Sequence, residues 1–424
     1  MDTLKPIVVI GGGFAGLTFI KHTNRKKREI ILIDKDNYNS FPPLFYQVAS
    51  AGLDPSGICF AFRREMRSRR AKGCRYHMGK VKCIDTVKHI VHTQYETIEY
   101  GQLIIAAGTT NNFFGIKDLE KSVYTLKSTT QAIRCRNDIL ERLEQAAVSS
   151  NPDYRRRVLS FTIVGGGPAG VEIAGALGEM KRYILHREYP GISPDDVSVT
   201  LVEGSDRLLG TMSKHSSRKA LEYLDSLMVN VKLGFCMQSY IDNTITFTNG
   251  EQLYSEMVIW TAGVTSNTFE FIGPQPQIGR GGRLIVDAYN RVFGIPDVFA
   301  IGDIAIMPCD TWPQGHPQVA QVAIQQAKTL AYNIQRGSFP KPFVYRDKGT
   351  MATVGRNRAV ADLSCLRLYG RPAWFVWMAI HLMSLLGMRN RLTVFITWIW
   401  AYFSYSTSLR LILKPTRYPA RKKI

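Results

Sequence analysis

Short apolar runs alternate with amphipathic stretches along the first part of this chain. Residues 7–10 are consecutive apolar residues, and after a run of glycines a helical pattern covers 14–26. A second apolar run, 29–34, ends in an acid, and the run 103–109 passes into small residues. Apolar strands that alternate with helices are typical of β-α-β units, so we expect an α/β fold built on a parallel sheet.

A second copy of this pattern follows. An apolar run again meets a cluster of glycines, strand 198–203 again ends in an acid, and 257–264 again passes into small residues. Residues 157–265 are therefore an internal near-repeat of 1–109. The repeat predicts two Rossmann-like dinucleotide-binding domains, one inserted in the other.

Both copies carry a GxGxxG fingerprint where the first strand ends. Its first glycine permits the tight turn, its second lets a pyrophosphate approach the backbone, and its third lets helix pack on strand. An acid at the end of the next strand is placed to accept hydrogen bonds from ribose hydroxyls. These residues are Gly11, Gly13, Gly16 and Asp34 in the first copy, and Gly165, Gly167, Gly170 and Glu203 in the second. Two fingerprints predict two dinucleotide sites.

A third element, Val-Phe-Ala-Ile-Gly-Asp at 298–303, ends an apolar strand in a glycine and an acid. Together with the two fingerprints it resembles the two-dinucleotide-binding flavoproteins, which hold FAD and a nicotinamide nucleotide. A helix at about 128–147 and a polar linker at 149–154 join the two copies. The resemblance implies an FAD-binding domain at 1–115 and 290–345, an NADH-binding domain at 157–285, and a C-terminal region at 346–424.

The resemblance also assigns residues to each cofactor. For FAD they are Gly11, Gly13, Phe14, Ala15, Gly16, Asp34, Lys35, Val81, Ala107, Gly108, Gly302, Asp303 and Ala320. For NADH they are Gly165, Gly167, Pro168, Ala169, Gly170, Glu203 and Gly263. Glu172, just after the second fingerprint, is expected by analogy to point toward the nicotinamide end, although an acid on the helix surface is an alternative interpretation.

Glu203 also bears on the choice of nucleotide. A carboxylate at the ribose favours the diol of NADH and repels the 2′-phosphate of NADPH. Arg207 lies four residues further on and could soften that preference.

The cysteines bear on the electron acceptor. All seven are scattered without a CxxC or a Cys/His cluster, so no metal site is predicted. Residues 35–60 contain only Cys59, which argues against a disulfide reductase. Sulfide oxidation also needs paired cysteines, and the sequence leaves open that Cys135 and Cys309 are neighbours.

A more specific resemblance lies at 320–325, where the sequence reads Ala-Gln-Val-Ala-Ile-Gln. It is similar to the quinone-site motif of the type II NADH dehydrogenases, the NADH:quinone oxidoreductases that pump no protons. The segments 41–49, 349–356 and 387–391 agree with that family, as do Trp377 and His381. Departures are Asp34 in place of a glutamate, and Gln326 and Ala327 in place of a more acidic pair.

This resemblance implies the activity and its residues. NADH reduces FAD, and the electrons pass to a membrane quinone, either menaquinone or ubiquinone. Gln321 and Gln325 are the quinone-side residues, because their amides lie one helical turn apart on one face. Glu172 is the third expected catalytic residue. A homodimer stays open, as do two alternative functions: a soluble or sulfide-linked flavin reductase, and a flavin- and NADH-binding signalling protein.

The C-terminal region differs in composition. Residues 373–388 and 392–413 are apolar and rich in aromatics, and a basic tail follows (Arg417, Arg421, Lys422 and Lys423). Buried core helices, a transmembrane helix at 392–409, and helices lying on a membrane surface are the three interpretations. Aromatics flanked by basic residues favour the third.

The charge and the first residues complete this picture. The net charge of +20 suits anionic lipid, and we expect no nucleic-acid partner. The first residues show no signal-peptide pattern. We therefore expect a peripheral protein on the cytoplasmic side of the cell inner membrane.

Overall fold

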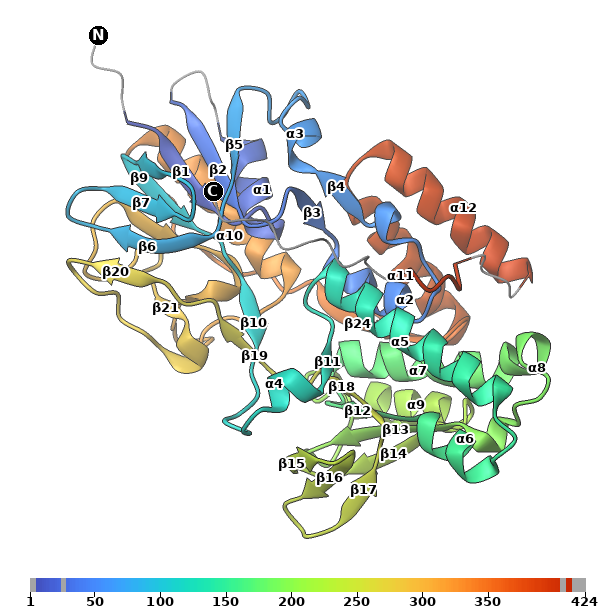
Figure 1. Ribbon diagram of the computed structural model, residues 1–424. Helices are drawn as coiled ribbons and strands as arrows, with labels where there is room; N and C mark the ends of the chain where they lie inside the picture. Colours follow the sequence, from blue (N-terminus) through green and yellow to red (C-terminus); the bar gives the residue numbers. More distant parts are fainter. Residues whose placement is uncertain (1–4, 24–27, 405–408, 414–424) are drawn as a thin grey trace, which may run out of the picture. The chain divides into compact units, whose positions relative to one another are not determined.

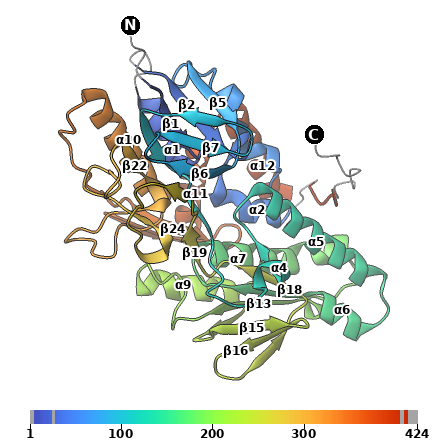
Figure 2. The same ribbon diagram turned by 60° about the vertical axis from the view of Figure 1, so that its left-hand side comes forward.

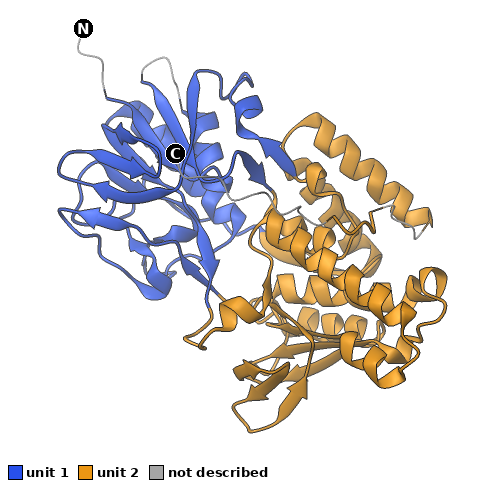
Figure 3. Ribbon diagram, viewed as in Figure 1, with its two compact units in different colours: residues 1–40, 59–112, 264–348 blue, residues 41–58, 113–263, 349–424 orange. Residues whose placement is uncertain are grey.

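A computed structural model describes residues 5–23, 28–404 and 409–413 of the chain. The chain divides into two compact units, coloured separately in Figure 3. Unit 1 comprises residues 1–40, 59–112 and 264–348, and unit 2 comprises 41–58, 113–263 and 349–424. The α/β fold expected from the sequence is confirmed, whereas the three functional domains stay a prediction.

A five-stranded parallel sheet forms the centre of unit 1. Its strands lie in the order β22-β9-β1-β2-β5 (Figure 1). Their bounds are β1 Ile7–Ile10, β2 Ile30–Asp34, β5 Cys74–Met78, β9 Gln102–Ile105 and β22 Val298–Ala300. Strand β1 lies in the middle of the sheet, because Ile7 pairs with both Ile30 on β2 and Gln102 on β9. The three parallel strands therefore end at the same edge of the sheet. This is the order that brings both fingerprint and acid to one edge of a Rossmann-like sheet.

Helices and a second sheet cover the two faces. Helices α1 (Phe14–His22) and α10 (Ala320–Arg336) pack against each other. The alternate residues of β1 and β2, such as Val8 and Ile31, join the core shared with the antiparallel strands β6 to β8. That sheet has the order β20-β6-β7-β8, with bounds β6 Val81–Asp85, β7 Ile90–Thr93, β8 Thr97–Glu99 and β20 Glu270–Ile272. Apolar side chains on both faces explain why these strands read as unbroken apolar runs.

Unit 2 repeats the plan. Its parallel sheet has the order β11-β18-β12-β13-β14. The bounds are β11 Tyr124–Thr125, β12 Ser160–Val164, β13 Ser198–Glu203, β14 Asn230–Leu233 and β18 Met257–Trp260. Helices α7 (Pro168–Tyr183) and α9 (Lys214–Asp225) lie against one side of it (Figure 1, Figure 2). The strands β15 Met237–Ile241, β16 Thr244–Phe247 and β17 Gln252–Tyr254 form a small antiparallel sheet whose Ile245 and Phe247 join the core of Val164 and Val202.

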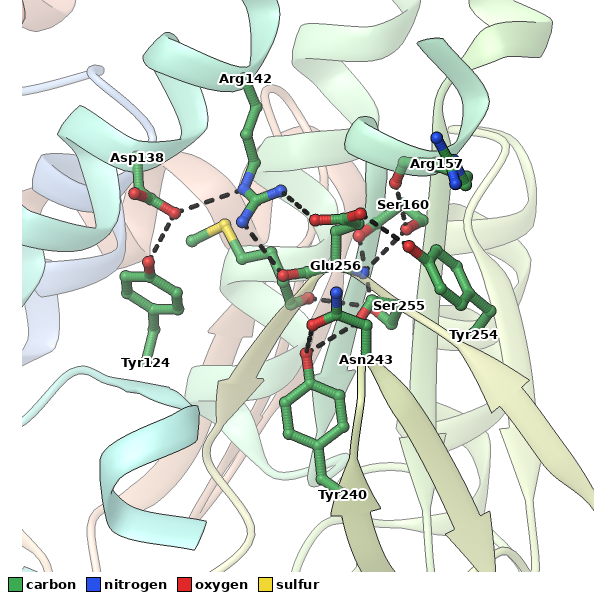
Figure 4. Close-up of polar contacts among 11 residues, drawn as sticks. Tyr124, Asp138, Arg142, Arg157, Ser160, Tyr240, Asn243, Tyr254, Ser255 and Glu256 are labelled. Atoms are coloured by element: carbon green, nitrogen blue, oxygen red, sulfur yellow. Dashed lines mark hydrogen bonds and ion pairs between the residues drawn. The ribbon is translucent and has the colours of Figure 1, made fainter. Parts of the chain in front are cut away.

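A polar cluster ties helix α5 (Thr129–Val148) to the sheet of unit 2 (Figure 4). Arg142 pairs with Asp138 at 3.3 Å and with Glu256 at 3.2 Å, and it also donates to the Glu256 carbonyl. Tyr124 donates to Asp138 at 2.5 Å. One guanidinium thus joins a helix to the residue that precedes β18, which fixes this helix at the edge of the sheet.

The C-terminal region packs within unit 2. Strands β24 (Gly349–Thr353), β25 (Ala359–Leu363) and β26 (Arg367–Tyr369) form an antiparallel sheet. Helix α11 (Gly370–Ser384) covers that sheet, and helix α12 (Met388–Ser404) follows. None of the helices in the described part of the chain is long and apolar enough to cross a bilayer. The basic tail and residues 405–408 lie outside the described residues.

Several predicted elements differ in their bounds. Helix α1 ends at His22, and residues 24–27 of the predicted helix lie outside the described residues. The polar linker predicted at 149–154 contains the start of a helix, α6 (Pro152–Val158), because Asn151 caps it and Pro152 suits its first position. The run 257–264 splits into β18 and the separate strand β19 (Val264–Ser266).

Short elements complete the two units. They are α2 Phe45–Ala49, α3 Phe62–Glu65, α4 Leu119–Ser122, α8 Leu185–Glu188, β3 Tyr38–Ser40, β4 Cys59–Ala61, β10 Thr109–Asn111, β21 Leu284–Ile285 and β23 Ala305–Ile306.

Candidate active site

The first glycine turn is built as its fingerprint requires. Gly11 has φ +98°, and a Cβ there would lie 2.5 Å from the Ala106 carbonyl oxygen. A Cβ on Gly16 would overlap the Gly11 carbonyl oxygen, so α1 lies too close to the turn for any side chain. Gly13, in contrast, faces open space. The close approach of helix and strand therefore leaves a bare backbone surface at the second glycine.

This surface fits a pyrophosphate. Gly13 is the N-cap of α1 and offers no side-chain hydrogen bond, and no acid lies in the first turn, where Phe14 and Ala15 follow. The positive end of the helix is thus left for an anion that comes from outside the chain. The residues present fit the phosphates of FAD.

Asp34 lies beside the same turn. Its carboxylate accepts from the Gly12 N–H at 2.6 Å and from the Asp36 N–H at 3.0 Å. Burial raises the pKa of Asp34 above its ordinary value, against these two hydrogen bonds. The acid is therefore anchored to the glycine turn, and its neighbour Lys35 is exposed.

Other predicted FAD residues lie at the ends of neighbouring elements. Ala107 and Gly108 lie two and three residues beyond the end of β9, and Val81 is the buried first residue of β6. Because β9 and β1 are adjacent parallel strands, Ala107 and Gly108 leave the sheet at the same edge as the glycine turn.

The strand-Gly-Asp element is held by helix α10. The Gly302 N–H donates to Gln326 at 2.7 Å, and Gln318 donates to the Asp303 carbonyl at 2.9 Å. Gln326 is fully buried. Gly302 has φ +77°, and a Cβ there would come within 3.2 Å of Ala15 on α1. The turn is thus fixed between the starts of two helices. The role of Gln326 in holding it was not predicted from the sequence.

Gln321 and Gln325 lie on one face of α10, as the spacing predicts, but their amides bind the chain itself. Gln321 donates to Asp347 at 3.2 Å and accepts from the Lys348 N–H at 3.0 Å. Gln325 donates to the Arg346 carbonyl at 2.9 Å and accepts from the Arg346 N–H at 3.0 Å. The pair therefore fixes the segment 346–348 against the helix that begins at Ala320, and their role toward a quinone stays a prediction.

The second glycine turn, in unit 2, repeats the first. Gly165 has φ +113°, and a Cβ on Gly170 would overlap the Gly165 carbonyl oxygen. Gly167 again faces open space and caps α7, with Pro168 at the first helical position. Ala169 is exposed in the first turn, and Gly263 follows β18 beside β12. This turn also presents a bare helix N-terminus that fits a pyrophosphate.

Glu203 ends β13 as predicted. It accepts from the Gly166 N–H at 2.5 Å with one oxygen, and from the Ser205 N–H and hydroxyl, each at 2.8 Å, with the other. Arg207 does not approach it: its guanidinium donates to the carbonyls of Met212 and Gly210. The Arg207 guanidinium, which could have bound a 2′-phosphate, is therefore held by hydrogen bonds within its own loop.

We predict a strong preference for NADH over NADPH, of roughly a hundredfold or more in kcat/KM, because we expect the Glu203 carboxylate to face the ribose and Arg207 is held within its own loop. A Glu203→Gln variant should reduce the ratio by about tenfold, since it keeps the shape and removes the charge. Asp206→Asn is the matched control, an exposed acid in the same loop. Equal use of both nucleotides by the wild type would contradict this role of Glu203.

Glu172 is buried rather than on the helix surface. It is 8% exposed, and its carboxyl accepts a hydrogen bond from the Thr353 backbone N–H. The Trp377 indole nitrogen is directed at the same carboxyl. Its N–H does not form a hydrogen bond of regular geometry with any described residue. Burial raises the pKa of Glu172 to about 8. The side chain therefore holds its proton at neutral pH, close to a pH at which it can release it.

Aromatic residues surround this acid. Trp377 stacks on His381 with ring centroids 4.0 Å apart and meets Tyr46 edge-on at 6.3 Å. Burial lowers the pKa of His381 to about 4, and its Nδ1 donates to the Trp377 carbonyl, so the imidazole is neutral. Tyr46 and Thr353 were missed in the sequence because they lie far along the chain from Glu172 and match no local pattern.

None of the seven cysteines, all of which lie in the described part of the chain, forms a disulfide. Burial strongly raises the pKa of Cys135. No cluster of metal-ligating side chains occurs within residues 5–23, 28–404 and 409–413.

With this geometry in place, comparison with known proteins gives the class. A family model described as pyridine nucleotide-disulphide oxidoreductase matches residues 5–327, so the chain is an oxidoreductase of that class. A second model, the NDH2 C-terminal domain, matches residues 348–405.

Whole-chain relatives narrow the class. The chain is 32% identical to the type II NADH:quinone oxidoreductase Ndh of Mycobacterium tuberculosis, covering 94% of this chain and 88% of the relative. It is 33% identical to the type II NADH:quinone oxidoreductase NdhA of the same organism, covering 92% of this chain and 86% of the relative. The chain therefore belongs to the type II NADH:quinone oxidoreductases, and the resemblance seen in the sequence is confirmed.

Solved structures agree on the fold. The NDH2 of Plasmodium falciparum in complex with NADH has a TM-score of 0.88 at 22% identity, covering 97% of this chain and all of that one. The sulfide:quinone oxidoreductase of Aquifex aeolicus has a TM-score of 0.72 at 17% identity, covering 95% and 96%.

Proposed function

We propose that the protein oxidises NADH and passes the electrons through bound FAD to a lipophilic quinone, without pumping protons. The observation that carries this proposal is the pair of bare glycine turns, one at the N-terminus of α1 and one at that of α7. When bound, FAD would accept a hydride from NADH and give two electrons to the quinone. Membership of the type II NADH:quinone oxidoreductases supports the choice of both substrates.

The chain's own residues would bind and orient these groups. The first turn with Asp34, and the Gly302–Asp303 turn held by Gln326, would hold the FAD phosphates and sugars. The second turn with Glu203 would hold the NADH ribose and pyrophosphate. Glu172 would hold a proton at its carboxyl and supply it as quinone is reduced, because quinol formation takes up protons and burial keeps this acid protonated.

The direct test is steady-state oxidation of NADH with purified, flavin-loaded protein and short-chain ubiquinone and menaquinone analogues. We expect turnover with quinone and retention of non-covalent FAD. A chain that is reduced by NADH but turns over only with sulfide or with a dithiol present would support the sulfide-linked alternative. A chain that binds both nucleotides and turns over very slowly would support a signalling role.

Gln321 and Gln325 should matter more to the quinone than to NADH. Replacing either with leucine should lower quinone turnover or raise the quinone KM by roughly tenfold or more, because the loss of the amides frees segment 346–348 beside the expected quinone face. Rapid flavin reduction by NADH should survive. Gln335→Leu, near the other end of α10, is the control. Equal loss of both half-reactions would show that the pair serves folding only.

We also propose that helices α11 and α12 bind the membrane surface. Ile396, Trp400 and Phe403 on α12 are 63%, 66% and 79% exposed, whereas Val394 and Trp398 on the same helix are buried. An amphipathic helix whose outward face is apolar and aromatic suits the headgroup region of a bilayer. The protein would then dock peripherally on the cytoplasmic side of the inner membrane, where both NADH and a lipophilic quinone can reach it.

A further inference from the structure

Glu172 is held from a second element by one residue. Thr353, the last residue of β24, donates its backbone N–H to the Glu172 carboxyl. Its side chain is used elsewhere, because the Thr353 hydroxyl lies 2.9 Å from the Tyr46 hydroxyl in a buried hydrogen bond. Thr353 therefore binds Glu172 through its backbone N–H and Tyr46 through its hydroxyl.

Tyr46 is in turn fixed by its neighbours on α2 and α12. The Gln47 amide donates to the Tyr46 hydroxyl at 3.0 Å, and the Gln47 carbonyl oxygen accepts from the Trp398 indole N–H at 2.8 Å. The chain of contacts thus runs from Trp398 through Gln47, Tyr46 and Thr353 to Glu172. Each of these partners is buried or half-buried, so a hydrogen bond lost here is not replaced by bulk water.

The groups that face Glu172 and this chain of contacts are otherwise neutral or paired. Burial raises the pKa of Tyr46, which stays a neutral phenol. His381 is neutral, and Glu179 further along α7 pairs with Arg356 at 3.4 Å. On β24, the Thr353 backbone N–H is therefore the donor that can stabilise a Glu172 carboxylate.

Tyr46 also borders a cavity. This space of about 130 Å³ is lined by Tyr46, Gln47, Glu179, Arg356, Trp377 and Trp398 among others. Glu172 and Thr353 do not line it. Removal of the Tyr46 hydroxyl alone leaves its ring in the lining of the cavity.

We propose that Tyr46 is a positioning residue for Glu172. Its hydroxyl fixes Thr353, and Thr353 holds the carboxyl in the orientation from which it exchanges its proton. The inference rests on the proposed function, because it assumes that Glu172 serves the NADH:quinone reaction. It assigns a role to Tyr46, a residue of the short helix α2 that belongs to neither glycine turn.

A Tyr46→Phe variant tests the proposal, since it keeps the ring and removes the hydroxyl. Quinone reduction by NADH should fall as the pH rises through the pKa of Glu172, because the protonated acid is the active form. Without its anchor, the Thr353 N–H should hold the carboxylate less well, which raises the pKa of Glu172 and moves this alkaline limb upward by about half a pH unit or more. The rate with ferricyanide, which accepts electrons without a proton, should not change.

Matched variants separate positioning from folding. Tyr402→Phe, on α12 beside the same cavity, should leave the pH profile as it is in the wild type. Thr353→Val removes the bonded hydroxyl and should move the limb in the same direction, whereas Thr353→Ser should restore the wild-type profile. If Tyr46→Phe does not fold, the Thr353→Val and Thr353→Ser variants test the same hydrogen bond from its other side.

The outcomes are distinct. An unchanged alkaline limb in folded Tyr46→Phe protein, or a limb that moves downward, overturns the inference while the proposed function stands. Failure of the wild-type chain to pass electrons from NADH to quinone overturns the proposed function itself.

Discussion

A Gly16→Val variant is expected to fold and to retain no flavin. A side chain at this position would overlap the Gly11 carbonyl oxygen and come within 3.3 Å of Val9, so α1 must move away from β1. Overpacking of this kind costs about 1–3 kcal/mol, which a domain of this size tolerates. The displaced helix would no longer present its N-terminus to the pyrophosphate. Purified variant should therefore be colourless, with no FAD released on denaturation.

The Gly170→Val variant is its counterpart in unit 2. A side chain there would overlap the Gly165 carbonyl oxygen and lie 2.8 Å from the Thr261 hydroxyl. This protein should keep its FAD, and dithionite should still reduce that FAD, but NADH should reduce it at least about a hundredfold more slowly. Gly191→Val, where a side chain meets open space, is the control for both. Loss of FAD from the Gly170→Val variant, or retention in the Gly16→Val variant, would contradict the assignment of the two turns.

The sequence was sufficient for the two turns because their chemistry is local. The fingerprint glycines must follow a strand directly, and the acids Asp34 and Glu203 must end the neighbouring strand. Both acids lie where predicted and bind a turn amide, Gly12 and Gly166 respectively.

What could not be predicted depends on contacts between distant residues. Tyr46 and Thr353 are 307 positions apart, and neither matches a pattern that would announce their hydrogen bond. Gln326 looked like a departure from the family pattern, yet its amide holds the Gly302 turn. The same limit applies to Gln321 and Gln325: helical spacing places their amides on one face, but the partners on segment 346–348 became visible only in the structure.

For the C-terminal helices, the sequence predicted apolar helices but not which residues face outward. Composition alone left buried, spanning and interfacial helices as alternatives, because all three need apolar residues. The side chains decide which residues face outward: on α12 Trp398 contacts Gln47 and Trp377, while Trp400 is 66% exposed. An apolar face without a covering element in the described part of the chain is what a membrane-binding helix requires.

Replacing Ile396, Trp400 and Phe403 together with serine should release the protein from membranes. Each of these exposed side chains is expected to gain about 1.5 kcal/mol or more on entering a bilayer, so their loss should weaken binding to vesicles by roughly a thousandfold. Sedimentation with vesicles that contain anionic lipid measures this directly. Because apolar insertion supplies the affinity, high salt should release the wild type poorly and detergent should release it well.

The function of the released variant completes the test. It should keep its FAD and reduce a short-chain quinone in solution, but it should reduce long-chain quinone in vesicles poorly, because the acceptor lies in the bilayer. Val148, Ile241 and Val344 are 87%, 67% and 71% exposed elsewhere on the chain, so a triple serine variant at these positions is the matched control. If that control lost vesicle binding to the same extent, or if the wild type ignored vesicles, α12 would not be the membrane-binding surface. A wild type that binds and a variant that does not would connect the exposed face of one helix to the access of the enzyme to its quinone.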